Sequence, residues 1–207
     1  MRLNKNIRQT LRIAKIELSS MFYSPVAWLI LVIFALLIGY DYANIFDSQL
    51  HSQSLGNNLW SVSSAIYNSW MTGILKPILR NLYLYIPLIT MGLMSREYQS
   101  GSVKLLYSSP IKNSSIILGK YLAMMCYGAA LMSIIGLNVL FSWLTVENFQ
   151  ISMLLVGMLG IYLLILAYSA IGLFMSTLTA YQVVAAIGTL AVLAVLNFIG
   201  DVGQSID

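Results

Sequence analysis

Charged side chains are scarce in this sequence, and the groups that most enzymes use for catalysis are scarcer still. Asp, Glu, Lys and Arg make up only 9% of its 207 residues, against about a quarter in a typical soluble domain. There is one histidine, His51, and one cysteine, Cys126, so no internal disulfide can form. No GxxxxGK[ST] motif is present, which argues against a P-loop ATPase. We therefore expect no catalytic residue, no metal site and no bound cofactor, and we expect Cys126 to pack as a small hydrophobe.

Long apolar runs take the place of charge. Hydrophobic residues make up 59% of the chain, which is typical of a polytopic, all-α membrane bundle. Each run of about 20 apolar residues can cross the hydrocarbon core as a helix. Five such spans are predicted, at about 21–40, 74–94, 116–144, 151–175 and 181–199.

The basic residues collect in two segments, 1–20 and 95–120. Such clusters lie on the cytoplasmic side of membrane proteins, so we place the amino terminus inside and the carboxyl terminus outside. The net charge of +4 is then explained by topology, without a nucleic-acid partner. The stretch from Asp41 to Gly73 has no Lys or Arg and is predicted to lie outside, with a short interfacial helix around 59–70.

Residues 1–20 form the first predicted unit, an amphipathic helix ahead of a transmembrane domain at 21–207. One face carries the apolar side chains, namely Leu3, Ile7, Leu11, Ala14 and Leu18. Basic amphipathic helices of this kind usually lie among the lipid headgroups. We assign Arg8, Arg12, Lys15 and Glu17 to this membrane-interface anchor. The alternative is a basic flank that only sets the orientation.

The second and fourth spans carry further features. Lys76 and Arg80 share a face of the second span, where they either reach the outer interface or form a basic mouth for an anionic substrate. Pro87 is expected to kink that span. Small side chains in the fourth span favour close helix packing; they are Gly157, Gly160, Ala167, Ser169, Ala170 and Gly172.

The segment from Ser95 to Lys120 is the longest polar interruption on the predicted inner side. Residues 98–108 are predicted to form one short helix that Pro110 ends. Gly101 is expected to allow close approach of another backbone, and Arg96 and Glu97 to form interfacial ion pairs. Lys120 is expected to emerge into the cytoplasm with the first turn of the third span. Taken alone, the segment fits either a contact for a partner protein or an amphipathic helix lying on the bilayer.

Two stretches carry residue patterns that match a known family. The first is PLITMGLMSREYQSGSVKLLYSSPIKNSSIILGKYLA, Pro87 to Ala123, with a proline-bearing span end, a Glu, a Gly-Ser pair, paired leucines, a proline and a Gly-Lys pair. This stretch resembles the permeases of ABC-2 type transporters. The second, ELSSMFYSPVAWLILVIFALLIGY, is similar to the start of the branch of this family associated with gliding motility and copper-enzyme maturation. A weaker resemblance to the family lies in MSTLTAYQVVAA, Met175 to Ala186. The chain departs from the pattern at Lys104, where many relatives carry an acid.

The resemblance implies an ATP-driven exporter of the bacterial cytoplasmic membrane. In such an exporter two permease halves, identical or different, rest on separate ABC ATP-binding subunits, and these subunits bind ATP and Mg²⁺. It assigns coupling to the ATPase to the segment between the second and third spans. The matching positions there are Glu97, Gly101, Ser102, Leu105, Leu106 and Pro110. The family usually has six spans, so a sixth is expected to be missing, by truncation or because it lies in a longer polypeptide. The alternative function is a non-transporting membrane anchor of a cell-envelope or motility complex.

Overall fold

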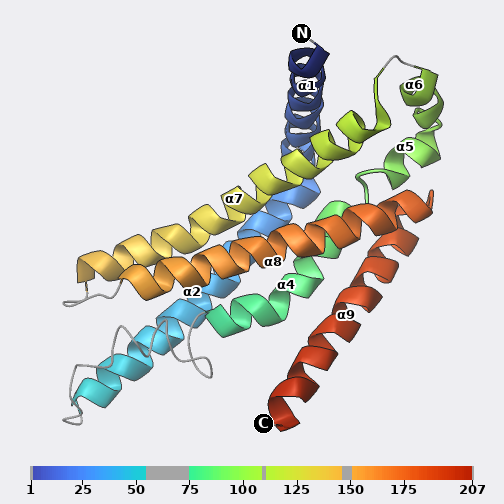
Figure 1. Ribbon diagram of the computed structural model, residues 1–207. Helices are drawn as coiled ribbons and strands as arrows, with labels where there is room; N and C mark the ends of the chain where they lie inside the picture. Colours follow the sequence, from blue (N-terminus) through green and yellow to red (C-terminus); the bar gives the residue numbers. More distant parts are fainter. Residues whose placement is uncertain (1, 55–74, 109–110, 146–150, 207) are drawn as a thin grey trace. The chain divides into compact units, whose positions relative to one another are not determined.

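The computed structural model describes residues 2–54, 75–108, 111–145 and 151–206, and every regular element in these ranges is a helix (Figure 1). The all-α membrane bundle predicted from composition is therefore confirmed. In chain order the helices are α1 (Arg2–Tyr23), α2 (Pro25–Ser54), α4 (Leu75–Thr90), α5 (Ser95–Ser100), α6 (Val103–Ser108), α7 (Asn113–Thr145), α8 (Ile151–Leu178) and α9 (Gln182–Ile206).

Four described helices are long and apolar enough to cross a membrane, at Pro25–Ile45, Asn113–Phe141, Leu155–Leu178 and Gln182–Gly200. They correspond to the first, third, fourth and fifth predicted spans, with ends that differ by a few residues. The predicted second span contains α4, whose 16 residues reach about 24 Å at 1.5 Å per residue. A hydrocarbon core is about 30 Å thick, so the count of five crossings stays a prediction.

The amphipathic helix and the first span are separated by a single residue, Ser24. Pro25 disfavours helical geometry in the residue before it and has no N–H to continue the hydrogen-bond ladder. The Ser24 N–H instead donates to the Met21 carbonyl at 3.0 Å. As a result α1 continues to Tyr23, past the boundary expected at residue 20. Further on, α2 continues to Ser54, well into the stretch expected to lie outside, and the helix predicted around 59–70 lies outside the described residues.

A short corner, residues 91–94, replaces the end of the predicted second span. The helix continues past Pro87 and stops at Thr90, and the Leu93 N–H then makes a turn-like bond to the Thr90 carbonyl at 3.1 Å. The segment predicted to be cytoplasmic begins at this corner as α5. Its first residue, Ser95, is fully buried.

The single helix predicted for residues 98–108 is wrong, because two short helices, α5 and α6, occupy the segment instead. Gly101 separates them with φ of +72°, in the left-handed region that glycine adopts without strain. Its N–H donates to the Tyr98 carbonyl at 3.2 Å and closes α5. A Cβ at Gly101 would meet no atom of the described residues within 4 Å, so within the chain the glycine is needed for its conformation, and the close approach of a partner's backbone stays a prediction.

The described helices group into two compact units. Unit 1 holds residues 1–28, 83–128 and 165–207, and unit 2 holds residues 29–82 and 129–164. The core of unit 2 repeats at every fourth residue of α2, where Ile30, Phe34, Ile38 and Tyr42 are buried. A core cluster of unit 1 lies beside the 91–94 corner and consists of Leu93, Met94, Met124 and Leu173. Cys126 does not join a core, contrary to expectation, because its side chain is exposed.

Candidate functional site

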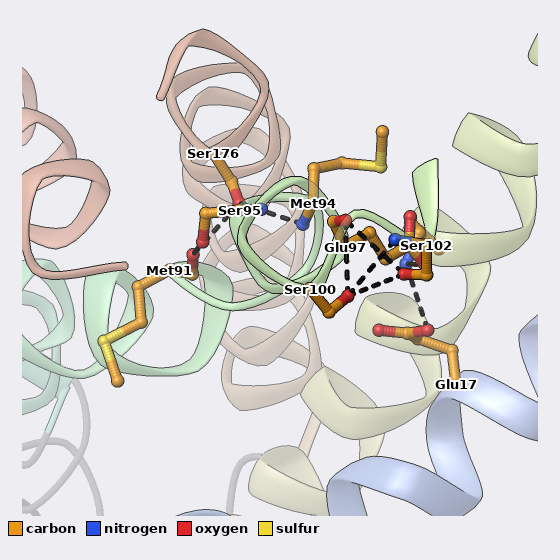
Figure 2. Close-up of polar contacts among 9 residues, drawn as sticks. Glu17, Met91, Met94, Ser95, Glu97, Ser100, Ser102 and Ser176 are labelled. Carbon is orange, nitrogen blue, oxygen red and sulfur yellow. Dashed lines mark hydrogen bonds and ion pairs between the residues drawn. The ribbon is translucent and has the colours of Figure 1, made fainter. Parts of the chain in front are cut away.

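Lys120 is a buried cation near the start of α7. Its side chain is only 2% exposed, and its ammonium nitrogen lies 3.1 Å from Glu17 Oε2 and 2.8 Å from Glu97 Oε1. The two contacts connect α1, α7 and α5 within unit 1, and Figure 2 labels the two acids, Glu17 and Glu97. Lys120 is therefore enclosed by protein contacts, and its place at the cytoplasmic end of the third span stays a prediction. We call Glu17, Glu97 and Lys120 the charge triad.

The charge triad carries one more negative than positive charge. Both carboxylates are largely withdrawn from solvent, with side chains 21% and 22% exposed. Glu97 Oε2 is buried and has no hydrogen-bond partner in the described part of the chain. Desolvated carboxylates depend on nearby cations and donors, because water no longer solvates them. Lys120 is thus the group that makes the burial of two acids tolerable.

Gly119 explains how α1 comes close enough to α7 for the triad to form. A Cβ at Gly119 would lie 2.7 Å from Ile13 Cγ2 and 3.0 Å from the Thr10 carbonyl oxygen, closer than side chains tolerate. Gly119 and Lys120 therefore have two structural roles. The glycine admits the backbone of α1, and the next residue supplies the charge that Glu17 meets.

The contact also shows which face of α1 packs on the protein. Thr10, Ile13 and Glu17 meet α7 and are spaced by three and four residues, as expected for one helix face. Part of the predicted apolar stripe points elsewhere, since Ile7 and Leu11 are 57% and 56% exposed. Ile13 lies outside that stripe because it belongs to the packing face.

A serine from α8 anchors the start of α5. Ser176 Oγ accepts hydrogen bonds from the backbone N–H groups of Met94 at 3.0 Å and Ser95 at 3.1 Å, and donates to the Met91 carbonyl at 3.0 Å (Figure 2). Ser95 Oγ donates to the same carbonyl. Helix starts leave N–H groups without helical partners. Here a side chain distant in sequence supplies the acceptor, so α5 is tied to α8.

We expect Ser176→Ala to loosen this corner. The substitution leaves two buried N–H groups without an acceptor, and each such loss is worth about 1–3 kcal/mol. Hydrogen exchange of the amides of residues 94 and 95 should rise at least about tenfold. Thr177→Ala is the matched control, because Thr177 is the next residue and its hydroxyl donates within its own helix, to the Phe174 carbonyl. Equal exchange in the two variants would contradict the anchoring role.

The far end of α5 is fixed by smaller contacts. Ser102 Oγ lies 2.8 Å from Ser100 Oγ and donates to the Glu97 carbonyl at 3.4 Å. On the side of α9, Gln182 donates to the Gln99 side chain at 3.4 Å. With Ser176 and the charge triad, these contacts connect α5 to α1, α7, α8 and α9.

The predicted site residues separate into three groups. Glu17, Glu97, Gly101 and Ser102 lie in or beside the network just described. Arg8, Arg12 and Lys15 are exposed on α1. The side chains of Lys76, Arg80, Leu105 and Leu106, and the whole of Pro110, lie outside the described residues, so the pathway mouth and the apolar part of the coupling segment stay predictions.

Sequence reasoning missed two residues of the network, Lys120 as its centre and Ser176 as its anchor. A signal for Lys120 existed, since a lysine between the apolar stretches IILG and YLA is costly in a membrane unless it is paired. Ser176 gave a weaker signal, because serine is common at the packed faces of membrane helices.

Comparison with known proteins gives one match. The family model described as ABC-2 family transporter protein matches residues 11–204. No curated protein matches the chain, and no solved structure does. The matched region includes all three residues of the charge triad as well as Gly119 and Ser176.

Proposed function

Because the chain belongs to the ABC-2 transporter family, we propose that it is the permease subunit of an ATP-driven exporter. In this proposal it pairs with a second permease half, and a separate ABC ATP-binding subunit hydrolyses ATP to drive transport. Its apolar helices make it an integral membrane protein. The proposal further places it in the bacterial cytoplasmic membrane, with the amino terminus on the cytoplasmic side where the basic residues collect.

One observation carries the coupling part of the proposal, the link from Glu97 through Lys120 to Glu17. A segment that receives force from an ATPase needs firm connections to the helices that move. Short α5 is connected in this way to α7 by Lys120 and to α8 by Ser176. Displacement of α5 by a bound ATPase would therefore displace both of these membrane helices.

The coupling surface itself is proposed to run from Glu97 to Pro110. It includes Gly101 and Ser102 at the joint between α5 and α6, and the paired Leu105 and Leu106 as its apolar contact. The backbone break at Gly101 fits this role, because it lets α6 turn away from α5 while α5 stays anchored.

Affinity purification of the tagged chain from its native membranes tests this function. We expect a P-loop subunit and ATP hydrolysis to co-purify. Leu106→Asp should reduce the recovered ATPase about tenfold or more, since it places a carboxylate in an apolar contact. Ser20→Asp is the control, because it adds the same charge at an exposed position of α1.

The two possible failures are distinct. If no ATPase accompanies the wild-type chain, the permease function is wrong and the non-transporting anchor is favoured. If an ATPase accompanies both the wild type and Leu106→Asp in equal amounts, the permease function stands and the coupling surface is wrong.

A further inference from the structure

The exposed charge on the described part of α1 is entirely positive. Arg8, Arg12 and Lys15 are exposed, whereas the acid of this helix, Glu17, is withdrawn into the charge triad. At 100° per residue the three basic positions fall within an arc of about 60°. The packing face, with Thr10, Ile13 and Glu17, lies on the opposite side.

An apolar strip lies between the basic arc and the packing face. It includes Ile7 and Leu11, which are 57% and 56% exposed. A helix with an exposed apolar strip beside a basic arc is typical of segments that lie in the lipid headgroup region. Anionic headgroups are the chemical complement of the basic arc.

The way α1 meets α7 fits a position at the membrane surface. Thr10, Ile13 and Glu17 span about 10 Å of α1, yet they meet α7 at two adjacent residues, Gly119 and Lys120. Contacts that converge in this manner are expected where two helices cross. Gly119 lies less than two turns from the start of α7, and Pro25, which opens the first span, follows α1 after one residue.

We infer that α1 binds the phosphate headgroups of anionic phospholipids through Arg8, Arg12 and Lys15, and that this binding controls ATP turnover through the charge triad. The second step rests on the proposed function. Because Glu17 and the basic arc are on one rigid helix, a shift of α1 at the lipid surface moves Glu17 against Lys120, which also holds Glu97 of α5. Lipid charge thereby acts on the segment proposed to contact the ATPase.

The lipid-binding step is tested on the full chain in vesicles, without any ATPase. A nitroxide label at position 11, introduced by Leu11→Cys in a Cys126→Ser background, reports by its oxygen accessibility whether the apolar strip is in lipid. We expect the label to be lipid-immersed in vesicles with roughly one-third phosphatidylglycerol. The combined variant Arg8→Gln, Arg12→Gln, Lys15→Gln should move it to water. The charge-retaining variant Arg8→Lys, Arg12→Lys should leave it immersed.

A label that stays at the same depth in the neutralised variant overturns the inference. So does a label that reaches the same depth in pure phosphatidylcholine. Inorganic phosphate added to phosphatidylcholine vesicles separates the two sources of phosphate, and immersion produced by free phosphate would overturn the lipid assignment. This arm is independent of the proposed function.

The control step is tested on the co-purified complex. We expect phosphatidylglycerol to raise ATP turnover about fivefold over phosphatidylcholine, and the neutralised variant to show no such rise. Glu17→Gln should keep the label immersed in lipid but lose the increase in ATP turnover. This result would distinguish the role of the charge triad from lipid binding itself. Lys112→Gln, at an exposed position outside the coupling surface, should keep the rise.

Three results would overturn the control step. One is a full phosphatidylglycerol response in Glu17→Gln. Another is loss of the response in Lys112→Gln. The third is loss of the ATPase from the neutralised variant during purification in detergent, which would make the basic arc a protein-docking surface instead of a lipid-binding one.

Discussion

Lys120→Met should abolish ATP-driven turnover and lower the free energy of unfolding by about 3–5 kcal/mol, the range measured when one partner of a buried ion pair is removed. The substitution roughly keeps the volume of the side chain but leaves Glu17 and Glu97 facing each other with no cation between them. For a chain of this length the loss corresponds to a drop in melting temperature on the order of 10 °C. Thermal unfolding in detergent and ATPase assays of the co-purified complex measure the two effects.

A charge-neutral variant separates the stability of the triad from its role in coupling. Glu17→Gln, Glu97→Gln and Lys120→Met together remove every charge, so the uncompensated buried charge that destabilises Lys120→Met is no longer present. We expect this triple variant to recover the wild-type melting temperature to within a few degrees but not the ATP turnover. Its glutamines no longer share a lysine, so α1 and α5 are no longer linked through α7.

The matched control for the single substitution is Lys112→Met. Lys112 is exposed just before α7, and surface changes usually stay within about 0.5 kcal/mol. The role of the triad is contradicted if Lys120→Met unfolds at the same temperature as Lys112→Met. The coupling role alone is contradicted if the triple variant hydrolyses ATP like the wild type.

The spans were the most predictable part of the fold. Four of the five predicted runs are helices that can cross a membrane, because the length of an apolar run is a property of the sequence alone. The residues at which helices begin and end were less predictable. Pro25 begins α2, four residues after the predicted start of the first span. Gly101 was recognised as a special residue, but its left-handed conformation, which divides α5 from α6, was not foreseen.

The charge triad could be predicted only in part. Glu17, Glu97 and the Gly119–Lys120 pair were each singled out by resemblance, but as separate features of three segments. Their meeting depends on the crossing of α1 and α7, because Glu17 and Lys120 are 103 positions apart in the sequence. Neither amphipathic periodicity nor charge counting contains that information. Periodicity marks the apolar strip of α1, and it did not identify the mixed face of Thr10, Ile13 and Glu17 that meets α7.

The helix contacts of the fourth span could likewise be predicted only in part. Sequence reasoning placed both Gly160 and Gly172 among the small residues available for helix contacts. In the structure a Cβ at Gly160 would meet no atom within 4 Å, whereas one at Gly172 would collide with Thr90. Composition identifies the candidates, but only the positions of the neighbouring helices distinguish the contact from the unused surface.

Gly172→Ala should therefore be far more damaging than its small size suggests. The added Cβ would collide with Thr90 Oγ1 and lie 2.7 Å from Thr90 Cβ. Rotation of the threonine side chain can relieve the first contact but not the second, since Cβ does not move with the rotamer. Thr90 is fully buried, and its hydroxyl donates to the Ile86 carbonyl at 2.8 Å. The chain must respond by separating α4 from α8, and overpacking of this kind costs about 3 kcal/mol.

The separation should also reach the coupling segment. Ser176 lies one helical turn beyond Gly172 and holds Met91, Met94 and Ser95, the residues that follow Thr90. We expect Gly172→Ala to lower both the melting temperature and ATP turnover, and to raise amide exchange at residues 94 and 95 as Ser176→Ala does. Gly160→Ala, on the same helix, should be neutral or slightly stabilising, because alanine is the better helix former.

Second substitutions at Thr90 test whether its contact with position 172 causes the damage in Gly172→Ala. Adding Thr90→Ala to Gly172→Ala removes the contacts with Oγ1 and Cγ2 but leaves the 2.7 Å contact with Cβ, so recovery should be partial. Adding Thr90→Gly removes all three contacts, at a cost of about 1 kcal/mol in helix propensity relative to Thr90→Ala. It should restore turnover further than Thr90→Ala does. Equal melting temperatures for Gly172→Ala and Gly160→Ala, or rescue by neither second substitution, would show that α8 is not held against α4 at this glycine.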